Sequence, residues 1–517
     1  MAASSVIDVS AALAAGPATA AQWLVVLPAA SCLLLSAVLV MLWRQPRLQQ
    51  LLAVAGLAFL VLVDLLLLRQ VLATGPVTMV MGRWLPPFGI AFTADLTGVL
   101  MALAAALVAF VVCLSAAGER ETSGRGDGFY PMLLMLMAGV SGAFLTGDIF
   151  NLYVWFEVLL IASFGLIALG PERAQIDGAL KYAVLNLVAT TLFLIAVGIL
   201  YAVFGTLNMA DIVMKAPDLR ETAPLVTLTA LFLLAFGMKA AAFPVNFWLP
   251  AAYHTPRPAV AALFAGLLTK VGIYALLRVT VMLFPPEREQ LEPLIATVAV
   301  ATMLTGGLGA LAQNDIRRML GFVVIAGIGT VLAGLSLGGP GGIGGALFYA
   351  LHSMVLMTAL YLAIGEAGRI GGSFSLAALG GLYGRHAGFA GLCLCLFFAA
   401  SGLPPFSGFW PKAMLVKAAL DVGAWWLAGA MLLSGFLLTI AFGRVFLMAF
   451  WRPAKETAPP VLALRWQAIG PLLLLAALVV GFGAFPELLL RTVQDAEITL
   501  DNPQAYLGSV FPQGAAP

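Results

Sequence analysis

The sequence carries very little charge. Asp, Glu, Lys and Arg make up only 10% of its 517 residues, whereas a globular domain has about a quarter. Lys and Arg exceed Asp and Glu by two, and they form no basic run interleaved with aromatic residues, which argues against nucleic acid as a partner. Apolar residues make up 62% of the chain, and the mean hydropathy is +1.04. The composition predicts an all-α integral membrane protein with many spans.

Residues that bind metals or form disulfides are also scarce. The chain has three histidines and four cysteines. The cysteines lie in apolar runs without the CxxC spacing of a zinc or redox site: Cys32, Cys113, Cys393 and Cys395. No GxGxxG motif follows a predicted strand. We therefore expect no metal site, no disulfide and no redox cofactor.

Apolar segments long enough to cross a bilayer recur along the chain, divided by Gly, Pro and charge clusters. We expect about fourteen spans, near residues 22–43, 49–74, 94–117, 128–147, 150–170, 177–206, 223–248, 257–283, 290–313, 319–337, 342–365, 388–421, 425–450 and 466–485. Assigning the loops to alternate sides puts fifteen Lys and Arg on one side and six on the other. The positive-inside rule then predicts that the richer side is cytoplasmic and that both termini lie outside.

Four charged residues interrupt these apolar segments: Glu157, Lys239, Lys270 and Lys412. A charge at the centre of a membrane helix costs about 2.5 to 3.5 kcal/mol on insertion scales. Folding alone does not favour such residues, so we interpret them as functional. Glu157 is the only carboxylate that we expect deep in the membrane. Because hard cations prefer carboxylate ligands, we expect protons to use this chain and a metal cation to pass elsewhere.

Two of the expected spans contain prolines together with a Phe-Trp pair and a lysine, at residues 239–250 and 403–412. Proline removes a backbone donor, so each span should break and leave carbonyls that protein or water must satisfy. The two segments lie in the seventh and twelfth spans, an offset of five, and an odd offset inverts the second copy. This pattern favours transport or ion conduction, although proline kinks that only shape a bundle would look the same.

The expected repeats divide the chain into four parts. Residues 1–127 form N-terminal helices, 128–283 the first five-helix repeat and 290–452 the second, inverted repeat. Residues 453–517 form a C-terminal span and an external tail.

Several motifs resemble one family. They are Gly147 to Glu157, Phe243 to Pro258, Leu268 to Arg278, Asp315 to Arg318 and Leu403 to Lys412. These runs are similar to the antiporter-like subunits shared by respiratory complex I and Mrp-type cation/proton antiporters. The resemblance covers residues 90–450, and the stretch after the first Phe-Trp pair is most similar to the D-type subunits of the Mrp group.

The resemblance implies a proton path through Glu157, Lys239, Lys270, His352 and Lys412. Glu157 would pair with Lys239, and the lysine would release its proton when it loses that partner. The resemblance also implies a bacterial inner membrane location, exchange of Na⁺ or K⁺ for protons in pH homeostasis, and partner subunits of the Mrp A, B, C, E, F and G types. The sequence departs from many relatives at Met357, where they carry a lysine, so His352 bears more of the path.

Some of these residues have structural alternatives. Lys412 follows a broken helix and could satisfy its freed carbonyls, and His352 could be a core histidine. Lys417 is better explained as a snorkelling side chain. Helix capping or anchoring explains Asp148 and Lys181, and a cytoplasmic turn explains Asp315, Arg317 and Arg318.

Two alternative functions remain open at this stage. A proton-pumping subunit of an NADH dehydrogenase or membrane hydrogenase would use nearly the same residues. A membrane enzyme such as a lipid-linked transferase would need a cluster of Asp, Glu or His in a loop, and the longest expected loops, 75–93, 206–222 and 366–387, show none. We therefore expect a transporter subunit and not an enzyme.

Overall fold

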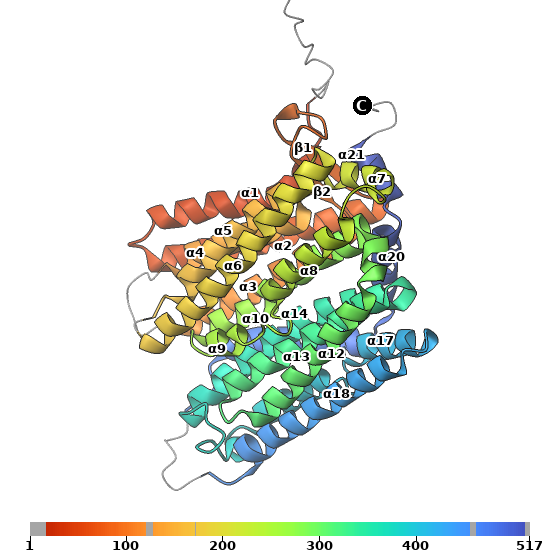
Figure 1. The fold of residues 1–517 in the computed structure, drawn as a ribbon. Helices are drawn as coiled ribbons and strands as arrows, with labels where there is room; N and C mark the ends of the chain where they lie inside the picture. Colours follow the sequence, from red (N-terminus) through yellow and green to blue (C-terminus); the bar gives the residue numbers. More distant parts are fainter. Residues whose placement is uncertain (1–16, 120–127, 171, 455–461, 512–517) are drawn as a thin grey trace, which may run out of the picture.

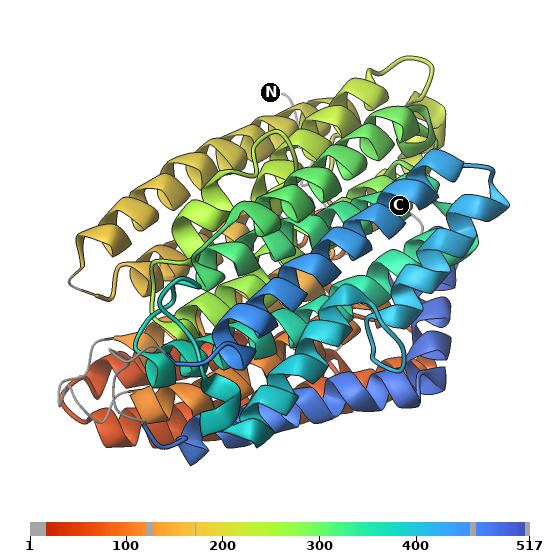
Figure 2. The ribbon, with the colours of Figure 1, turned by 90° about the horizontal axis from the view of Figure 1, so that it is seen from below.

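The computed structural model describes residues 17–119, 128–170, 172–454 and 462–511. The boundary expected after residue 127 falls outside these ranges. Nearly all of the described chain is helical, and the helices form one slanted bundle (Figure 1). Seen from below in Figure 2, the long helices run in roughly the same direction and cover one another in several layers.

Eleven of the described helices are long and apolar enough to cross a membrane. They are α1 (Ala20–Met41), α2 (Pro46–Thr74), α3 (Leu96–Glu119), α5 (Ile149–Ile167), α6 (Arg173–Phe204), α10 (Pro258–Leu277), α12 (Glu292–Ala312), α13 (Ile316–Leu337), α14 (Gly339–Gly371), α18 (Trp425–Val445) and α19 (Trp466–Ala484). Three apolar helices are shorter: α4 (Phe129–Leu145), α8 (Leu225–Ala240) and α16 (Ala387–Ser401). Each segment expected from the sequence overlaps one of these helices.

The remaining elements lie at the ends or breaks of the bundle. They are α7 (Met209–Leu219), α9 (Trp248–Tyr253), α11 (Pro285–Gln290), α15 (Leu382–Arg385), α17 (Phe409–Asp421), α20 (Glu487–Asp501) and α21 (Gln504–Val510). Strands β1 (Val77–Val80) and β2 (Ala91–Ala94) form an antiparallel hairpin in which Val77 pairs with Ala94. Figure 1 shows the hairpin, α7 and α21 at one end of the bundle.

Helices α10 and α14 form the centre of the bundle. Their apolar windows are buried along their whole length, and α14 packs against α3, α10, α13, α17, α19 and α20. The outer helices keep wide apolar faces, such as the one on α6 that includes Leu180, Leu187 and Ile195. An apolar face that is not covered by protein suits lipid, and a helix that is apolar on all sides suits the core of the bundle. Lys270 of α10 and His352 of α14 are enclosed by protein.

The first proline segment breaks its span as expected. Helix α8 ends at Ala240, Ala241 adopts a left-handed backbone conformation with φ 63°, and α9 begins at Trp248. Two threonines of α12 accept hydrogen bonds from the unwound segment between α8 and α9. Thr302 Oγ1 accepts from the Phe243 amide at 3.0 Å, and Thr305 Oγ1 accepts from Asn246 Nδ2 at 2.9 Å. Protein therefore replaces the hydrogen bonds that lipid cannot supply.

The second proline segment breaks in the same way. Helix α16 ends at Ser401, Gly402 has φ 84°, and α17 begins at Phe409. Here the unwound chain binds to α19. Ser407 N donates to Val479 O at 3.1 Å, and Trp410 Nε1 donates to Gly483 O at 2.8 Å. A side chain at Gly483 would collide with the Pro405 carbonyl, so glycine is required for this close contact.

Two halves of the bundle share a series of local features in the same order. Asp148 caps α5, and the adjoining backbone pairs with the chain before α7 through Ile149 N to Leu207 O and Met209 N to Gly147 O. Asp315 caps α13, and the same pattern recurs through Ile316 N to Phe374 O and Leu376 N to Asn314 O. A broken helix follows each pair. Helices α10 and α18 then both end in a π-helical turn, at Arg278–Leu283 and Phe446–Trp451.

A line of buried charges as the candidate functional site

Lys239 lies at the end of α8, immediately before the first break. Its side chain is buried, and its Nζ has no hydrogen-bond partner among the described residues. The ammonium lies 5.4 Å from the centre of the Phe156 ring on α5, close enough for a cation–π contact. A buried ammonium without an ion-pair partner is costly, so this position is unfavourable for folding.

Glu157 lies next to Phe156 and is half-buried on α5. Its charge acts on Lys239 through space, but none of the ion pairs among the described residues joins the two groups. The expected direct pair therefore does not form in this conformation. The neighbour of Glu157 on its own helix is the phenol of Tyr153. The aromatic rings of Phe156, Phe193 and Phe236 pack together beside the lysine, which explains why it approaches a ring and not the carboxylate.

Lys270 lies in the middle of α10 and is also buried. Its Nζ donates to the Ala265 carbonyl of the same helix at 2.8 Å. Two residues further along, Gly272 lets α10 pack closely against the end of α8, because an added Cβ would lie 3.1 Å from the Ala240 nitrogen. The helices that carry Lys239 and Lys270 therefore touch beside these two residues.

His352 lies between Lys270 and Lys412. It is buried on α14, and those two lysines are the charges that act on its ring. His352 Nδ1 is 2.8 Å from Ser407 Oγ in the second break. The other ring nitrogen faces Gly408, where an added Cβ would lie 3.0 Å from His352 Nε2. The unwound segment therefore holds the central histidine in place.

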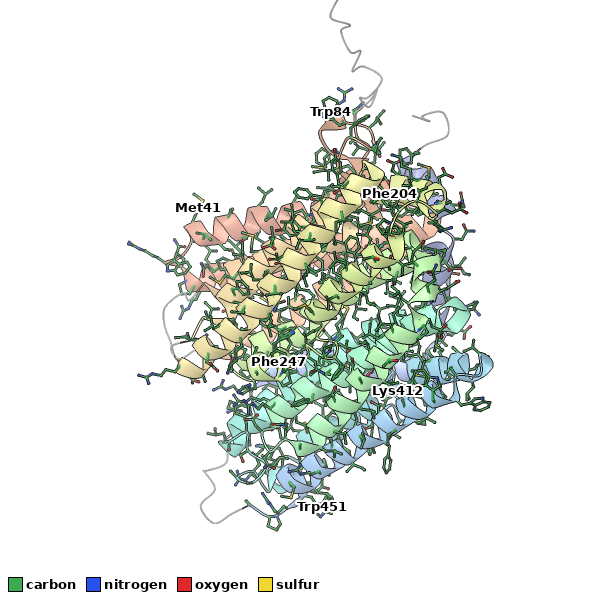
Figure 3. All side chains as sticks on the ribbon, in the orientation of Figure 1. Met41, Trp84, Phe204, Phe247, Lys412 and Trp451 are labelled. Carbon is green, nitrogen blue, oxygen red and sulfur yellow. The ribbon has the colours of Figure 1, made fainter. Side chains whose placement is uncertain are left out.

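Lys412 is on the first turn of α17, and Figure 3 labels it beside α17 and α18. Its Nζ donates to the carbonyls of Ala400 at 3.1 Å and Ser401 at 2.8 Å. The lysine thus satisfies the last carbonyls of α16, which is the structural role that the sequence left open for it. The stem of Lys412 crosses Gly402, where a side chain would leave no room. Capping and proton transfer are compatible, because an ammonium offers three donors.

The threonine hydroxyls near His352 donate within their own helices, and Thr330 also hydrogen-bonds the phenol of Tyr349, whose ring packs against His352. Thr358 donates to Met354 O at 2.8 Å and Thr330 donates to Ala326 O at 3.1 Å. Met357 is buried and adds no charge. His352 is therefore the titratable group that links the two lysines among the described residues of this region. We call Glu157, Lys239, Lys270, His352 and Lys412 the buried line.

The residues that the sequence assigned to structural roles lie outside the buried line. Asp148 accepts from the Asn151 amide at 2.8 Å and caps α5. Lys181 pairs with Asp177, and Lys417 pairs with Asp421, both on the surface. Asp315 caps α13 and pairs with Arg317, as expected for a turn.

The sequence interpretation missed one deep carboxylate. Asp64 lies in the middle of α2 with no exposed surface, so Glu157 is not the only carboxylate at membrane depth. The signal was present, because the stretch Leu65 to Leu68 follows Asp64 directly and an apolar run precedes it. Asp95 is a second buried carboxylate, at the start of α3, and it forms an ion pair with Arg278.

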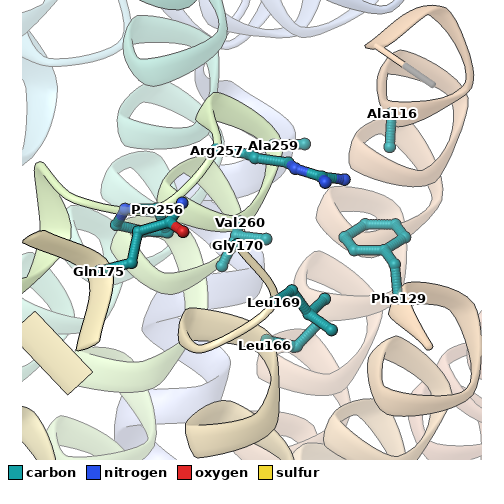
Figure 4. Close-up of a pocket in the computed structure, with 10 residues that line it drawn as sticks. All are labelled: Ala116, Phe129, Leu166, Leu169, Gly170, Gln175, Pro256, Arg257, Ala259 and Val260. Carbon is teal, nitrogen blue, oxygen red and sulfur yellow. The ribbon is translucent and has the colours of Figure 1, made fainter. Parts of the chain in front are cut away.

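Three pockets among the described residues lie beside the buried line. A pocket of about 220 Å³ borders the first break and is lined by apolar residues of α8 and α12. A larger pocket of about 540 Å³ is lined by Arg257, Glu366, Arg369 and Arg465 at the far end of α14. Figure 4 shows a third, between the end of α5 and the start of α10, whose volume of about 10 Å³ leaves room for at most one water.

The family described as NADH:quinone oxidoreductase/Mrp antiporter, TM, matches residues 146–439. This match covers more than half of the chain and includes the whole buried line. The chain belongs to this family. The sequence-based assignment to the complex I and Mrp group is therefore confirmed.

Relatives within the NADH:quinone oxidoreductase/Mrp antiporter family match over nearly the whole chain. The D subunit of the Na(+)/H(+) antiporter of Alkalihalophilus pseudofirmus is 37% identical over 94% of this chain and 99% of the relative. The protein of the same name in Bacillus subtilis is 35% identical over the same shares. A chain of the Mrp complex of a Dietzia species has a TM-score of 0.89 and 29% identity, covering 95% of this chain and 100% of that one.

Proposed function

We propose that this chain is the proton-translocating membrane subunit of a multi-subunit antiporter that exchanges Na⁺ or K⁺ for protons across the bacterial inner membrane. The observation that carries the proposal is the series of buried Lys270, buried His352 and partly buried Lys412 in a relative of Na(+)/H(+) antiporter D subunits. Buried ionisable groups at membrane depth are costly and mark ion pathways. The relatives are named as antiporter subunits, so we propose a transporter without an enzymatic reaction of its own.

The proposed architecture has fourteen membrane spans. In it, the eleven long helices are joined by α4 and by two broken spans, α8 with α9 and α16 with α17. Residues 128–283 and 290–452 form the two inverted repeats. Their shared capping aspartates, backbone pairs, breaks and π-helical ends support this division. Residues 1–127 add the N-terminal helices, and 453–517 add the last span and a tail, with both termini outside.

The proposed mechanism moves charge along the buried line. Because Lys270 and Lys412 each lie close enough to influence His352, a proton held by either lysine disfavours the protonated form of the histidine. His352 exchanges protons with the lysine on either side, and Ser407 orients its ring. At the other end, the charge of Glu157 favours the protonated form of Lys239. A change in the position of Glu157 would therefore release or load a proton at Lys239.

The position of Glu157 supports a partner subunit that covers this part of α5. The carboxylate is only half-buried at membrane depth, although lipid is a poor environment for it. We propose that another member of an Mrp-type complex covers this face of α5, as the similarity to a chain of the Dietzia Mrp complex supports. Partners of the Mrp A, B, C, E, F and G types complete the proposed assembly, which serves pH homeostasis.

The test uses the whole complex in inside-out membrane vesicles. A pH-sensitive dye reports proton efflux from the vesicles when Na⁺ or K⁺ is added. We expect exchange in the parent, loss of exchange in Glu157→Ala, and normal exchange in Glu172→Ala, which removes an exposed glutamate. Normal exchange in Glu157→Ala would contradict the role assigned to this residue, and failure of the parent to respond to either cation would contradict antiport.

A second function has specific structural support. The archaeal membrane-bound sulfane sulfur reductase contains a chain with a TM-score of 0.85 and 26% identity, covering 95% of this chain. A proton-pumping subunit of an NADH dehydrogenase or hydrogenase complex would use the same buried line. Purification of the native complex separates the two functions. Small hydrophobic partners support the antiporter, whereas iron–sulfur or flavin proteins support the pump.

A further inference from the structure

Helix α2 carries a carboxyl group that the buried line does not use. Asp64 lies on the buried stripe of this helix, together with Leu57, Leu60, Leu67 and Val71. Its side chain has 0% exposure, and neither carboxyl oxygen has a hydrogen-bond partner among the described residues. The stripe follows the three-and-four spacing of a helix face, so the fold turns Asp64 into the protein.

Other buried polar groups nearby do have partners. Gln49, on the same stripe of α2, donates from Nε2 to the Leu39 carbonyl at 2.7 Å. Asp95, at the start of the adjacent α3, pairs with Arg278 and accepts from the Gly98 amide. The protein therefore satisfies comparable groups and leaves Asp64 unpaired.

The neighbouring helices provide no counter-charge. Helix α2 packs against α1, α3 and α4, and the sequences of residues 20–41, 96–116 and 129–145 contain no Lys, Arg, His, Asp or Glu. The titratable group on which Asp64 acts is the thiol of Cys32 on α1. The other titratable side chains on these faces are Cys113 of α3 and Tyr130 of α4. None of them supplies a positive charge.

An unpaired carboxylate in such surroundings is far less stable than the neutral acid. A metal cation would offset the charge only with several oxygen ligands, and the described residues contain no group of three or more His, Cys, Asp and Glu side chains. A proton needs no such ligands. The chemistry of the site therefore favours a bound proton over Na⁺ or K⁺.

Helix α1, which packs against α2, contains a proline that interrupts its backbone hydrogen bonds. Pro28 lies inside α1, one turn before Cys32, and its ring removes a backbone hydrogen bond from the helix. Ser31 donates to the Pro28 carbonyl at 3.3 Å, on the same turn. A helix without its full set of hydrogen bonds bends more easily, so α1 is the element that could open a route to Asp64.

We propose that Asp64 is a second proton-binding site, formed by the α1 to α4 helices and separate from the buried line. It holds a proton in the conformation described here, and it exchanges that proton during transport. The first part of the proposal stands on the surroundings of Asp64 alone. The second part rests on the proposed antiport.

Infrared spectroscopy of the whole complex in lipid membranes tests both parts. A protonated carboxylic acid gives a carbonyl band that is separate from the carboxylate bands, and replacement of its proton by deuterium shifts this band. The spectrum of the parent minus that of Asp64→Asn isolates the band of Asp64. Asp177→Asn is the matched control, because Asp177 is exposed and pairs with Lys181. Asp64→Glu keeps an acid at this position and should retain a shifted band, which guards against loss of folding in the Asn variant.

We expect a protonated-acid band in the parent at neutral pH that disappears in Asp64→Asn and persists in Asp177→Asn. After transfer to heavy water, the band should shift slowly in the absence of Na⁺ and K⁺. The rate of this shift should rise at least tenfold once Na⁺ or K⁺ starts antiport. Absence of a band that depends on Asp64 would overturn the proton site. A band whose shift is no faster while dye-reported antiport proceeds would overturn its exchange during transport. If the parent shows the band but no antiport with either cation, the proposed function fails and the proton site stands.

Discussion

His352 Nδ1 lies 2.8 Å from Ser407 Oγ, so the central histidine of the buried line is attached to the unwound segment between α16 and α17. Ser407 is attached in turn to α19 through its amide, which donates to Val479 O. The same short segment thus carries the break, the histidine contact and the contact with the last long helix. Any movement of the break changes the position of the histidine ring.

Replacement of Ser407 by alanine should slow antiport about tenfold, the effect of losing roughly 1.4 kcal/mol from one positioning hydrogen bond. The fold should persist, because the backbone contact with Val479 remains. Dye-reported exchange in vesicles provides the rate. Ser336→Ala is the control, since Ser336 is buried but donates to its own helix at Ala333. Equal rates in both variants would show that Ser407 does not position His352.

His352→Ala should abolish proton movement, because His352 is the group on which both Lys270 and Lys412 act. We expect at least a hundredfold loss, at the lower end of the range for a group that transfers protons. His386→Ala, at the edge of the bundle where its ring contacts Leu462 O, should transport normally. Transport at the parent rate in His352→Ala would exclude the path through the buried line.

Lys239→Leu should abolish antiport and yet stabilise the protein. The ammonium has no hydrogen-bond partner among the described residues, so its removal relieves a cost of about 2.5 to 3.5 kcal/mol on insertion scales. The melting temperature of the purified complex should rise, or stay unchanged if other subunits limit it. A clear fall in melting temperature, with correct assembly, would mean that Lys239 has a structural partner.

Lys412→Met should have the opposite effect on stability. This lysine donates to Ala400 O and Ser401 O, and loss of these charged hydrogen bonds should cost about 1.5 to 3 kcal/mol. Antiport should also be lost. The comparison of Lys239→Leu with Lys412→Met in one melting experiment separates a purely functional lysine from one that also caps a helix. Equal shifts in the two variants would contradict this distinction.

Thr305→Val should loosen the first break. Thr305 Oγ1 accepts from Asn246 Nδ2 in the unwound segment, and the loss of one such hydrogen bond costs about 1 kcal/mol. We expect a severalfold slower exchange and faster hydrogen exchange of the amides between Ala241 and Phe247. Thr297→Val on the same helix is exposed and should behave like the parent. If the amides between Ala241 and Phe247 exchange at the parent rate in Thr305→Val, the hydrogen bond to Thr302 alone would account for the stability of the unwound segment.

Much of the fold was predictable because it follows from local properties of the chain. Apolar length predicted the long helices, and the prolines predicted a break in each of the segments 239–250 and 403–412, where the helices end before Ala241 and Gly402. The partners of the breaks were not predictable. Thr302 and Thr305 come from α12, and Val479 and Gly483 come from α19. Contacts between distant segments depend on how the helices pack, which a local pattern does not contain.

The candidate site shows the same division. Glu157, Lys239, Lys270 and Lys412 were recognisable as charges in apolar runs, and His352 followed from the family resemblance. The expected ion pair of Glu157 and Lys239 does not form, because α5 turns Phe156 toward the lysine. Asp64 had the same kind of signal in the sequence and was missed, and only its complete burial distinguishes it.

The sequence by itself determined that this protein is a membrane bundle with charges at membrane depth, because hydropathy and the cost of a buried charge depend on residue type and position in a run. The tertiary structure decided which charges have partners. Lys412 caps α16, Lys239 faces an aromatic ring and Asp64 has no hydrogen-bond partner among the described residues. The physical reason is that the rotation and packing of whole helices set the neighbours of an ionisable group. Rotation of a helix by the angle between consecutive residues brings a different side chain to the same contact.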